Sequence, residues 1–569
     1  MNREAVRVIS PGVSLNDIVN SALWAAAGDS LGWTTELVDG AGVKRRVGRS
    51  RIEKPVDWKR KIGGSWGVDA KLPAGTYSDD TQLRLATSRS IRGDGIFDPE
   101  TFAKIELTVW PNYALGAGRG SKAASANLVR QDVNWFSNFF KSKDQSYMNG
   151  GGNGAAMRVQ PHVWCHGAAA RSPLLLDVCR NAITSHGHVH GFVGAAFHAL
   201  ALEYCLQQKR APDVEAMHAL LGELEKLPEI LSGDRHIAAF WIPAWENEGS
   251  SSLESALNDH LTEAHRKLDA IAPIARSVDP SRYQDVLESL GAFEPRLRGS
   301  GTITAMAASV LCLLHADNGA QAAVVTSANA LMSDTDTIGT MTGAMMGALE
   351  GAAPTWPIQD RDYLIAEASR MFSIRVGDQA DHFNYPDIAA WQAPQSQADA
   401  VGLVSDGRLG MAGLGELEPQ SEPMASRDTV WQWMQLPFGQ TVLAKHRNSP
   451  RTLSAKLLPG PRLSAVTVKP LRVIGQPGDS QPSLPLGNIG GLRTPSNESS
   501  ASPAPPEPTP KDPDDFIDGL TDRVIRSNFD PLVTGECFNR IVRVSGSIQM
   551  AVAFSAIVAK AQIARKKRG

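Results

Sequence analysis

The sequence is poor in cysteine, in net charge and in long apolar runs. Its five cysteines are an odd number scattered over 569 residues, so we expect reduced thiols in a cytoplasmic protein and no disulfide framework. Lysine and arginine (57) nearly balance aspartate and glutamate (60), which leaves a net charge of −3. This balance demands neither a nucleic acid nor an anionic membrane as partner.

Targeting and membrane-spanning signals are missing as well. Pro11 and Asp17 break any apolar core of a signal sequence, and "SALWAAAG" at 21–28 is too short to supply one. Near the C-terminus, the apolar run in "SIQMAVAFSAIVAKAQIA" is shorter than the roughly 20 residues of a membrane span. We therefore expect no membrane span. We interpret this run as a packing or partner helix, with contact to a membrane surface as the alternative.

Most of the chain has a helical pattern. Residues 12–375 consist of Ala- and Leu-rich amphipathic segments between Gly- and Pro-containing loops, and strand-like alternation is scarce. This pattern predicts a mainly α domain. Behind it we expect four further parts: a loop-rich connector at 376–427, a small β module at 428–475, a disordered linker rich in Pro, Ser and Gly at 476–514, and a C-terminal helical segment with a basic tail at 515–569.

Two short acidic clusters precede predicted helices. "TYSDDTQLRLA" at 76–86 contains adjacent aspartates, and "LMSDTDTIGTMTGAMMGALEG" at 331–351 contains two more that alternate with threonine. Taken alone, the first cluster is typical of a helix N-terminal cap. If the clusters converge, four carboxylates need a cation, and Mg²⁺ or Mn²⁺ prefers such oxygen ligands. Cysteine and histidine spacing suited to structural zinc is absent from the sequence.

Glycines recur every four residues in the second of these helices. This periodicity places them on one helical face, where another backbone can approach closely. An interior glycine costs about 1 kcal/mol relative to alanine, so tight helix packing is the simplest interpretation. Such packing would also hold the preceding acidic cluster on a rigid element. The residues are Gly339, Gly343, Gly347 and Gly351.

Three further stretches combine glycine with polar residues. "GAGRGSKAAS" at 116–125 could offer backbone N–H groups to a phosphate, although a plain loop is the alternative. "GGGNGAAMRVQPHVW" at 150–164 allows close approach of the backbone. "SHGHVHGFVGAAFHA" at 185–199 begins with three alternating histidines. Because that spacing does not put all three on one helical face, we expect core or ligand-contact roles for them and no shared metal.

The ordered set of these motifs resembles the ADP-ribosylglycohydrolase family, which includes the dinitrogenase-reductase-activating glycohydrolase. The resemblance covers residues 15 to about 372 and is carried by "GDSLGWTTE", "YSDDTQLRLA", "GNGAAMR", "SHGHVHGFVGAA" and "SDTDTIGTMTGAMMGALEG". It implies an orthogonally packed all-α fold with two Mg²⁺ or Mn²⁺ ions. The implied metal ligands are Ser78, Asp79, Asp80, Asp334, Asp336 and Thr337.

The resemblance also implies catalytic and substrate-binding residues. Glu36 matches an acid near the metals and is expected to be catalytic together with Asp79 and Asp336. A glycine-rich loop would meet the diphosphate, and further residues would line the ADP-ribose site. These substrate-binding positions are Gly116, Gly118, Ser121, Asn153, Gly154 and His186.

The implied function is a metal-dependent hydrolase that removes ADP-ribose from a protein side chain or a related conjugate. Metal-assisted water would attack the anomeric carbon. The alternative is a catalytically silent ADP-ribose-binding or structural protein on the same scaffold. The expected partner is an ADP-ribosylated protein or small ADP-ribosyl substrate, with nucleic acid only as an ADP-ribosylated substrate. We expect the C-terminal region to bind a protein partner, and a chain ending near residue 380 to fold alone.

Overall fold

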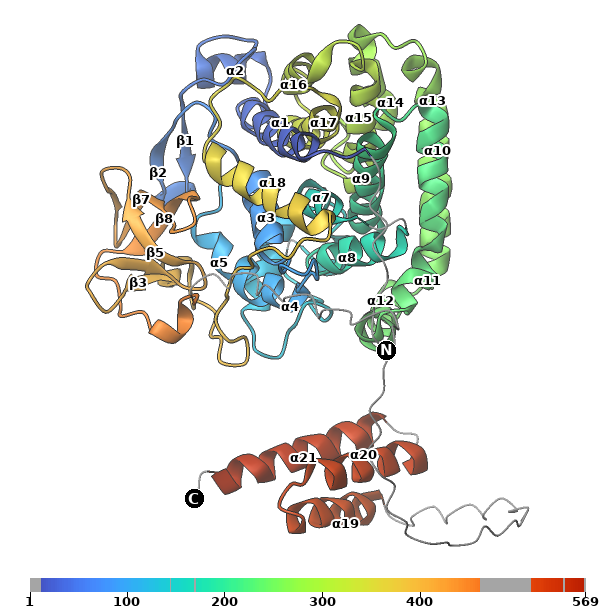
Figure 1. The fold of residues 1–569 in the computed structure, drawn as a ribbon, viewed down its shortest axis with the longest axis vertical. Helices are drawn as coiled ribbons and strands as arrows, with labels where there is room; N and C mark the ends of the chain where they lie inside the picture. The colour runs from blue at the N-terminus through green and yellow to red at the C-terminus, as the bar shows by residue number, and fades with distance from the viewer. Residues whose placement is uncertain (1–11, 144, 168–169, 461–512, 546–547, 567–569) are drawn as a thin grey trace, which may run out of the picture. The chain divides into compact units, whose positions relative to one another are not determined.

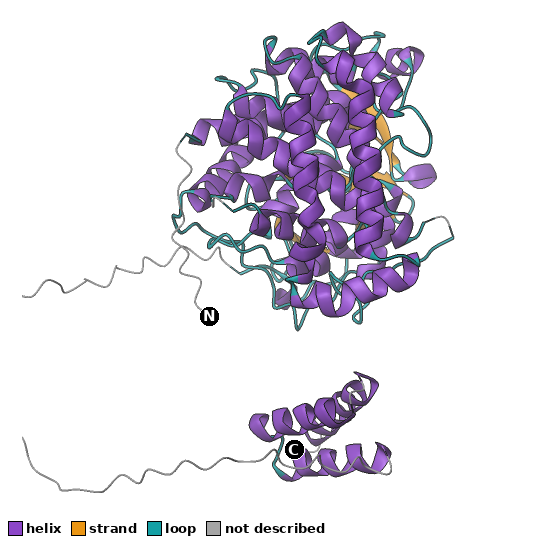
Figure 2. Ribbon diagram, turned by 90° about the vertical axis from the view of Figure 1, so that its right-hand side faces the viewer, coloured by secondary structure: helices purple, strands orange, loops and turns teal. Residues whose placement is uncertain are grey.

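The computed structural model describes residues 12–143, 145–167, 170–460, 513–545 and 548–566. The chain forms two compact units, Met1–Leu471 and Arg472–Gly569. Helices make up most of the first unit, which also contains two small antiparallel sheets (Figures 1 and 2). The prediction of a mainly α fold followed by a small sheet and C-terminal helices is confirmed. Residues 461–512, which hold nearly all of the expected linker, lie outside the described residues.

The helices of the first unit have the following bounds: Leu15–Trp33 (α1), Gly40–Val47 (α2), Asp79–Arg89 (α3), Pro99–Thr101 (α4), Leu107–Val109 (α5), Arg119–Leu128 (α6), Gln160–Cys165 (α7), Ser172–Ile183 (α8), Val189–Gln208 (α9), Val214–Glu223 (α10), Leu227–Ser232 (α11), Ile242–Gly249 (α12), Leu253–Ala275 (α13), Tyr283–Leu290 (α14), Gly301–Leu314 (α15), Gly319–Ala328 (α16), Thr335–Leu349 (α17) and Arg361–Arg375 (α18).

The first unit is built around the close contact of α1 and α17, which lie side by side in Figure 1. A Cβ atom added at Gly339 would lie 2.7 Å from the carbonyl oxygen of Gly28. Likewise, Cβ atoms at Gly343 and Gly347 would collide with the backbone of α1. The glycine face therefore packs as the spacing predicts. Gly351 is the exception, since it follows the end of α17 and a Cβ there would meet open space.

Two other features agree with the composition. Within the described residues, α9 is the one helix long and apolar enough to cross a membrane, and 89% of its apolar window is buried inside the protein. That burial is typical of a core helix. The five cysteine side chains are also buried, and all are thiols.

Strands form a hairpin and a six-stranded sheet in the first unit. The hairpin pairs β1 (Trp58–Ile62) with β2 (Val68–Leu72), and Trp58 lies opposite Leu72. The larger sheet has the order β3-β4-β5-β7-β6, with β8 also paired to β7. Its strands are Val401–Leu403 (β3), Leu409–Met411 (β4), Gly415–Pro419 (β5), Met424–Ser426 (β6), Thr429–Gln435 (β7) and Thr441–Arg447 (β8).

The larger sheet begins earlier than the sequence predicts. We expected loops over 376–427 and a β module over 428–475, but β3 to β6 lie between residues 401 and 426. The boundary at 428 is therefore wrong. Strands β3, β4 and β6 are only three residues long, so they carry too few residues for an alternating pattern. Their backbone groups are satisfied by neighbouring strands that the sequence does not place.

The larger sheet is packed into the helical part of the first unit. Met434 and Val442 belong to the same apolar cluster as the helices. Trp431 and Leu443 lie in a second cluster with Trp33 at the end of α1 and with the β1–β2 hairpin. Polar contacts add to this packing. Arg89 donates to the Gln440 side chain, and the Thr441 backbone donates to Asp360. The sheet is thus a structural part of the helical domain.

The second unit contains α19 (Pro513–Arg526), α20 (Pro531–Ser545) and α21 (Ile548–Lys566). These helices share an apolar cluster of their own that includes Val524, Ile541 and Phe554. The expectation of a helical C-terminal segment is confirmed, and the described part of the apolar run, 548–564, belongs to a packed helix.

A chain ending at residue 380 should be much less stable than a chain ending at 460. Removal of the sheet exposes Trp33, Trp58 and part of the main core, and each large apolar side chain that loses its packing costs on the order of 2 to 5 kcal/mol. We expect the shorter chain to precipitate, or to unfold roughly 10 °C or more below the longer chain. Thermal unfolding by circular dichroism makes the comparison. Equal midpoints with equal unfolding enthalpies would restore the expectation that the helical part folds alone.

Candidate functional site

The first acidic cluster is at the N-terminus of α3. Ser78 is the N-cap residue, and its Oγ accepts a hydrogen bond from the Asp80 backbone at 3.3 Å. Asp79 and Asp80 form the first turn, and both are buried. From α1, the Asp29 carboxylate accepts from the Ser78 N–H, the Thr81 N–H and the Thr81 hydroxyl at 2.6 to 2.9 Å. Asp29 therefore fixes the chain just before α3.

The second acidic cluster is at the N-terminus of α17, and it meets the first. Thr337 Oγ1 donates to Asp80 Oδ1 at 3.3 Å, and Thr340 Oγ1 donates to Asp80 Oδ2 at 2.7 Å. Asp334 is the N-cap residue of α17, and Asp336 is in its first turn. Because α1 packs against both α3 and α17, the two helix ends are brought together on one side of α1.

Glu36 completes this arrangement from the segment after α1. Oxygen atoms of Glu36, Asp334 and Asp336 lie within 4.8 Å of one another. The Glu36 side chain is 15% exposed, so this side of the site reaches the surface. Arg60 of β1 approaches Glu36 Oε2 at 3.4 Å. We call Glu36, Asp79, Asp80, Asp334 and Asp336 the acidic centre.

Burial and mutual repulsion dominate the electrostatics of the acidic centre. Burial raises the pKa of Asp79, Asp80 and Asp336 well above the ordinary carboxyl value, and neighbouring acids raise it further. The pKa of Glu36 is raised by burial and by Asp334, and is lowered in part by Arg60. At neutral pH such carboxylates need protons or cations. The donors are carboxylates and hydroxyls, which fits a hard divalent ion such as Mg²⁺ or Mn²⁺.

Two glycine-rich segments border the acidic centre. Gly116 has a φ of +92°, and a Cβ there would lie 2.8 Å from Asp79 Oδ1 and 3.0 Å from Trp33 Nε1. Gly118 is the N-cap residue of α6, so no side chain caps the first N–H groups of this helix. Ser121 is buried in the first turn of α6. From the second segment, Asn153 Nδ2 donates to Asp334 Oδ2 at 3.0 Å. The structure thus brings Gly116 and Asn153 to the acidic centre, and it places Ser121 Oγ 2.9 Å from where a Cβ of Gly154 would lie.

His186 lies behind Gly154, where a Cβ would be 3.1 Å from the imidazole ring. Its Nδ1 is 2.8 Å from Ser185 Oγ, which also accepts from Arg158. Burial, with the nearby Arg158 charge, lowers the pKa of His186 to about 3, so the ring is neutral. The other two histidines of the motif have different partners. His188 caps α9, and His190 Nδ1 is 2.8 Å from Ser300 Oγ.

Sequence reasoning did not assign roles to three residues that support the acidic centre. Asp29 is the only charged residue in "AAAGDSLGW", and that isolation inside an apolar helix could have marked it as a buried anchor. Trp33 Nε1 is buried without a hydrogen-bond partner among the described residues, close to Asp79. Arg84 of α3 is fully buried beside Asp29 and Asp80, and burial lowers its pKa to about 10.

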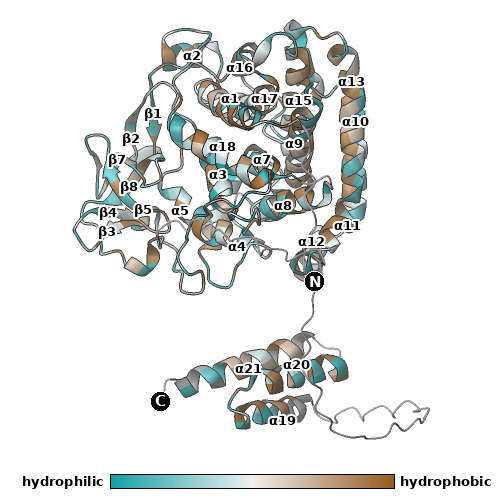
Figure 3. Ribbon diagram, viewed as in Figure 1, coloured by the Kyte–Doolittle hydropathy of each residue, from teal (hydrophilic) through white to brown (hydrophobic). Residues whose placement is uncertain are grey.

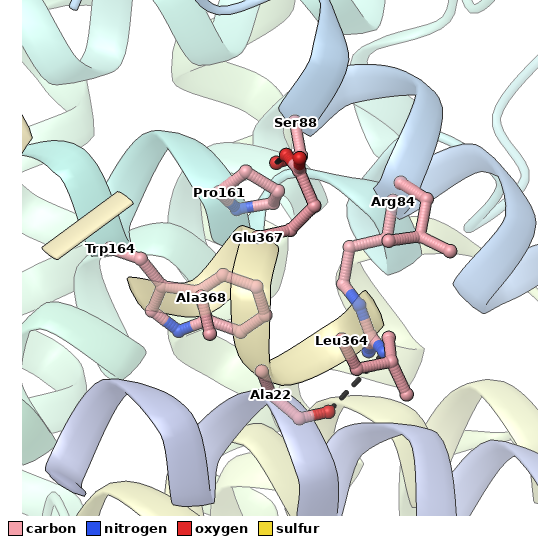
Figure 4. Close-up of a pocket in the computed structure, with 9 residues that line it drawn as sticks. Ala22, Arg84, Ser88, Pro161, Trp164, Leu364, Glu367 and Ala368 are labelled. Carbon is pink, nitrogen blue, oxygen red and sulfur yellow. Dashed lines mark hydrogen bonds between the residues drawn. The ribbon is translucent and has the colours of Figure 1, made fainter. Parts of the chain in front are cut away.

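The cavity next to Arg84 is not the functional site. Figure 4 shows Arg84 and Trp164 on its walls, with the Arg84 side chain donating a hydrogen bond to the Ala22 carbonyl oxygen. Its volume of about 10 Å³ has room for a single water molecule. A larger cavity of about 280 Å³ is lined by residues that include Arg89, Arg92 and His382, and no carboxylate of the acidic centre lines it.

The sequence model of the ADP-ribosylglycohydrolase family matches residues 14–377. The chain belongs to this family. A solved structure described as an ADP-ribosylglycohydrolase-related protein complex is similar at a TM-score of 0.40 and 18% identity, over 63% of this chain and 98% of that chain. Family membership indicates a hydrolase that acts on ADP-ribose conjugates, and the family is typically metal-dependent. The larger sheet and the second unit lie outside the matched residues.

Metal should stabilise the protein only while the acidic centre is intact. In EDTA, Asp79→Asn should unfold at or above the temperature of the natural protein, because it removes one buried, repelled carboxylate. With Mg²⁺ or Mn²⁺ at 100 times its Kd, the natural protein gains about 2.7 kcal/mol, and the variant should gain little. Differential scanning calorimetry measures both states, with the exposed Asp317→Asn as control. An equal metal response in Asp79→Asn would contradict the ligand assignment.

The metal-free protein should become more stable as the pH falls from 7 toward 5. The pKa values of Asp79, Asp80 and Asp336 are raised in the folded state above the ordinary carboxyl value of 3.8. At neutral pH this difference lowers the free energy of unfolding, and the loss disappears as the pH falls and the carboxylates take up protons in both states. With metal bound the sign should reverse, because protons compete with the ion. Urea unfolding at several pH values with and without Mn²⁺ tests this. The same slope in both series would count against a shared metal site.

Proposed function

We propose that the chain hydrolyses the glycosidic bond that joins ADP-ribose to a macromolecular side chain or a related conjugate. One observation carries the proposal. Acidic side chains converge in one buried group from the segment after α1 and from the N-termini of α3 and α17. All of their possible metal-ligand atoms are oxygens, and Glu36 is partly exposed at the edge of the group. A purely structural protein on this scaffold would gain nothing from this costly concentration of carboxylates.

The proposed metal ligands are Asp79, Asp80, Asp334 and Asp336, with hydroxyl oxygens from Ser78 and Thr337. Bound there, two Mg²⁺ or Mn²⁺ ions would supply Lewis-acid polarisation of a water molecule and of ribose hydroxyls. The chain itself orients these ligands. Asn153 donates to Asp334, Thr340 donates to Asp80, and Asp29 anchors the start of α3. These contacts hold the Asp334 and Asp80 carboxylates and the start of α3 in place before substrate arrives.

Glu36 is proposed as the residue that moves a proton. Its carboxylate is near Asp334 and Asp336, partly exposed, and held by Arg60. It can accept a proton from the attacking water as the C–O bond forms at the anomeric carbon. The bond to the leaving side chain breaks as the water attacks; the leaving atom takes the bonding electron pair and then the proton that Glu36 accepted from the water. The positive charge that develops on the sugar ring during this step is stabilised by Asp79 and Asp336.

The glycine-rich segments are proposed to bind ADP-ribose. The N-terminus of α6 begins at Gly118 without a side-chain cap, so its N–H groups and helix dipole suit the diphosphate, with Ser121 beside them. Gly116 and Gly154 let the ligand approach the backbone, and neutral His186 lines the same wall. The unpartnered Trp33 Nε1 can donate to the ligand.

The alternative is an ADP-ribose-binding or structural protein without turnover. The two functions differ in one measurement, the release of free ADP-ribose from ADP-ribosyl-arginine, ADP-ribosyl-serine and ADP-ribosylated nucleic acid. Binding of ADP-ribose with no release from any substrate would favour the silent protein. The buried thiols suit a reducing compartment, and we retain the cytoplasm as the proposed location.

Glu36→Gln should reduce kcat about 100-fold or more, as expected for loss of a general base. The amide keeps the size of the side chain, so the Kd for ADP-ribose should change less than about threefold. Steady-state kinetics and calorimetry measure the two quantities, with the exposed Glu254→Gln of α13 as the matched control. Unchanged turnover in Glu36→Gln would leave Glu36 with a structural role only.

A further inference from the structure

Positive charge is concentrated in one segment that borders the acidic centre. Residues 44–61 contain nine lysines and arginines and two acidic residues, in a chain whose net charge is −3. We call this the basic segment. It comprises the end of α2, the loop that follows and most of β1. The balanced charge of the whole chain therefore conceals a strongly positive local surface.

Most of these basic side chains are exposed to solvent. In the β1–β2 hairpin, Trp58 and Ile62 are buried, whereas Lys59 and Lys61 are exposed. The register places Lys59 directly opposite Lys71, which is also exposed. Like charges in opposed positions destabilise a hairpin. Strand β1 accordingly carries hydrophilic colours over its middle residues in Figure 3. A bound anion would relieve this repulsion.

The basic segment reaches the acidic centre through two arginines. Arg60 pairs with the Glu36 carboxylate at 3.4 Å, and its guanidinium lies over the Trp33 ring. Arg46 donates to the Glu36 carbonyl oxygen at 3.2 Å and lies over the Trp58 ring. The positive surface therefore starts at the exposed edge of the proposed active site and continues along α2 and the hairpin.

An exposed tryptophan lies at the tip of the hairpin. Trp66 is 64% exposed, and the Arg427 guanidinium is 3.0 Å from the centroid of its ring. Ser426 of β6 donates to the Trp66 carbonyl oxygen, which ties the tip to the larger sheet. An exposed aromatic ring combined with lysines is the arrangement that single-stranded nucleic acids use, with phosphates on the cations and a base on the ring. An acidic peptide would match the charge but has no base to stack on the ring.

We propose that α2 and the β1–β2 hairpin form a docking surface for single-stranded nucleic acid, so that the ADP-ribose conjugates cleaved by this chain include ADP-ribosylated nucleic acid. The docking surface is independent of turnover, and the substrate assignment rests on the proposed function. The strand would run along Lys59 and Lys71 with one base on Trp66. Its ADP-ribosylated nucleotide would then reach Glu36 past Arg60.

The first test measures binding of an unmodified, fluorescent single-stranded 20-nucleotide DNA to the full chain by anisotropy. Lys59→Glu/Lys71→Glu should weaken binding at least tenfold in low salt. It should also lower the salt slope by about 1.4, the value for two lost phosphate contacts on a single strand. The matched control is Lys226→Glu/Arg235→Glu, an equal charge change near α11, on the opposite side of the first unit from β1 (Figure 1). The control should retain affinity within twofold.

The second test separates stacking from charge. Trp66→Ala should lose about tenfold in affinity for the oligonucleotide, within the range of one lost base–aromatic stack. Trp66→Phe keeps an aromatic face and should stay within threefold of the natural protein. Equal losses in both variants, or none in either, would contradict a stacking role.

The third test links the docking surface to the reaction. The test measures kcat/KM for an ADP-ribosylated oligonucleotide and divides it by kcat/KM for ADP-ribosyl-arginine. In Lys59→Glu/Lys71→Glu this quotient should fall at least tenfold. An unchanged ratio would overturn the substrate assignment. If oligonucleotide binds as described but no conjugate is cleaved, docking stands and the proposed function fails. No oligonucleotide binding in low salt, equal weakening by the control pair, or equal competition by polyglutamate would overturn the docking proposal.

Discussion

The repulsion among five buried or half-buried carboxylates is the constraint on which the rest of the first unit depends. Glu36, Asp79, Asp80, Asp334 and Asp336 come from three separate segments. Burial raises the pKa of Glu36, Asp79, Asp80 and Asp336, and neighbouring acids, Asp334 among them, raise it further. Side chains cannot be assembled this way unless the backbone around them is rigid. The glycine contact between α1 and α17 supplies that rigidity, because it brings two helix backbones closer than any larger residue allows. Asp29 and Thr340 then fix the direction of the carboxylates on α3.

The part of the chain beyond the family match contributes to the same region. Trp431 of β7 packs with Trp33 and Trp58, and a Cβ at Gly63 of the hairpin would lie 2.6 Å from the Trp431 ring. The hairpin in turn carries Arg60, which contacts Glu36. A continuous set of contacts therefore runs from the larger sheet to the proposed catalytic acid. We interpret the sheet as a support for the wall of the active site, with the hairpin as the surface that meets the macromolecular part of a substrate.

Local motifs explain why much of the site could be predicted from sequence, and tertiary packing explains the rest. Asp79, Asp80, Asp334 and Asp336 stand at helix starts, where short polar patterns are visible without knowledge of the fold. The glycine face of α17 is equally local, because its period is that of a helix. By contrast, Arg84 resembles any other charged residue in a helix until burial is known. The short strands β3 and β4 exist only because neighbouring strands bond to them. The position of Arg60 also depends on tertiary packing. Its hairpin is held by the apolar cluster of Trp33, Trp58 and Trp431, and Trp431 is far from the other two in the sequence.

The central claim is that the two acidic clusters form one divalent-metal site. Anomalous X-ray diffraction at the manganese edge, from crystals grown with Mn²⁺ and ADP-ribose, tests it most directly. The account predicts two anomalous peaks between the N-termini of α3 and α17, each within about 2.0 to 2.6 Å of oxygen atoms from Asp79, Asp80, Asp334 or Asp336. Ordered ADP-ribose with no anomalous peak at the acidic centre, or with peaks only elsewhere, would contradict it.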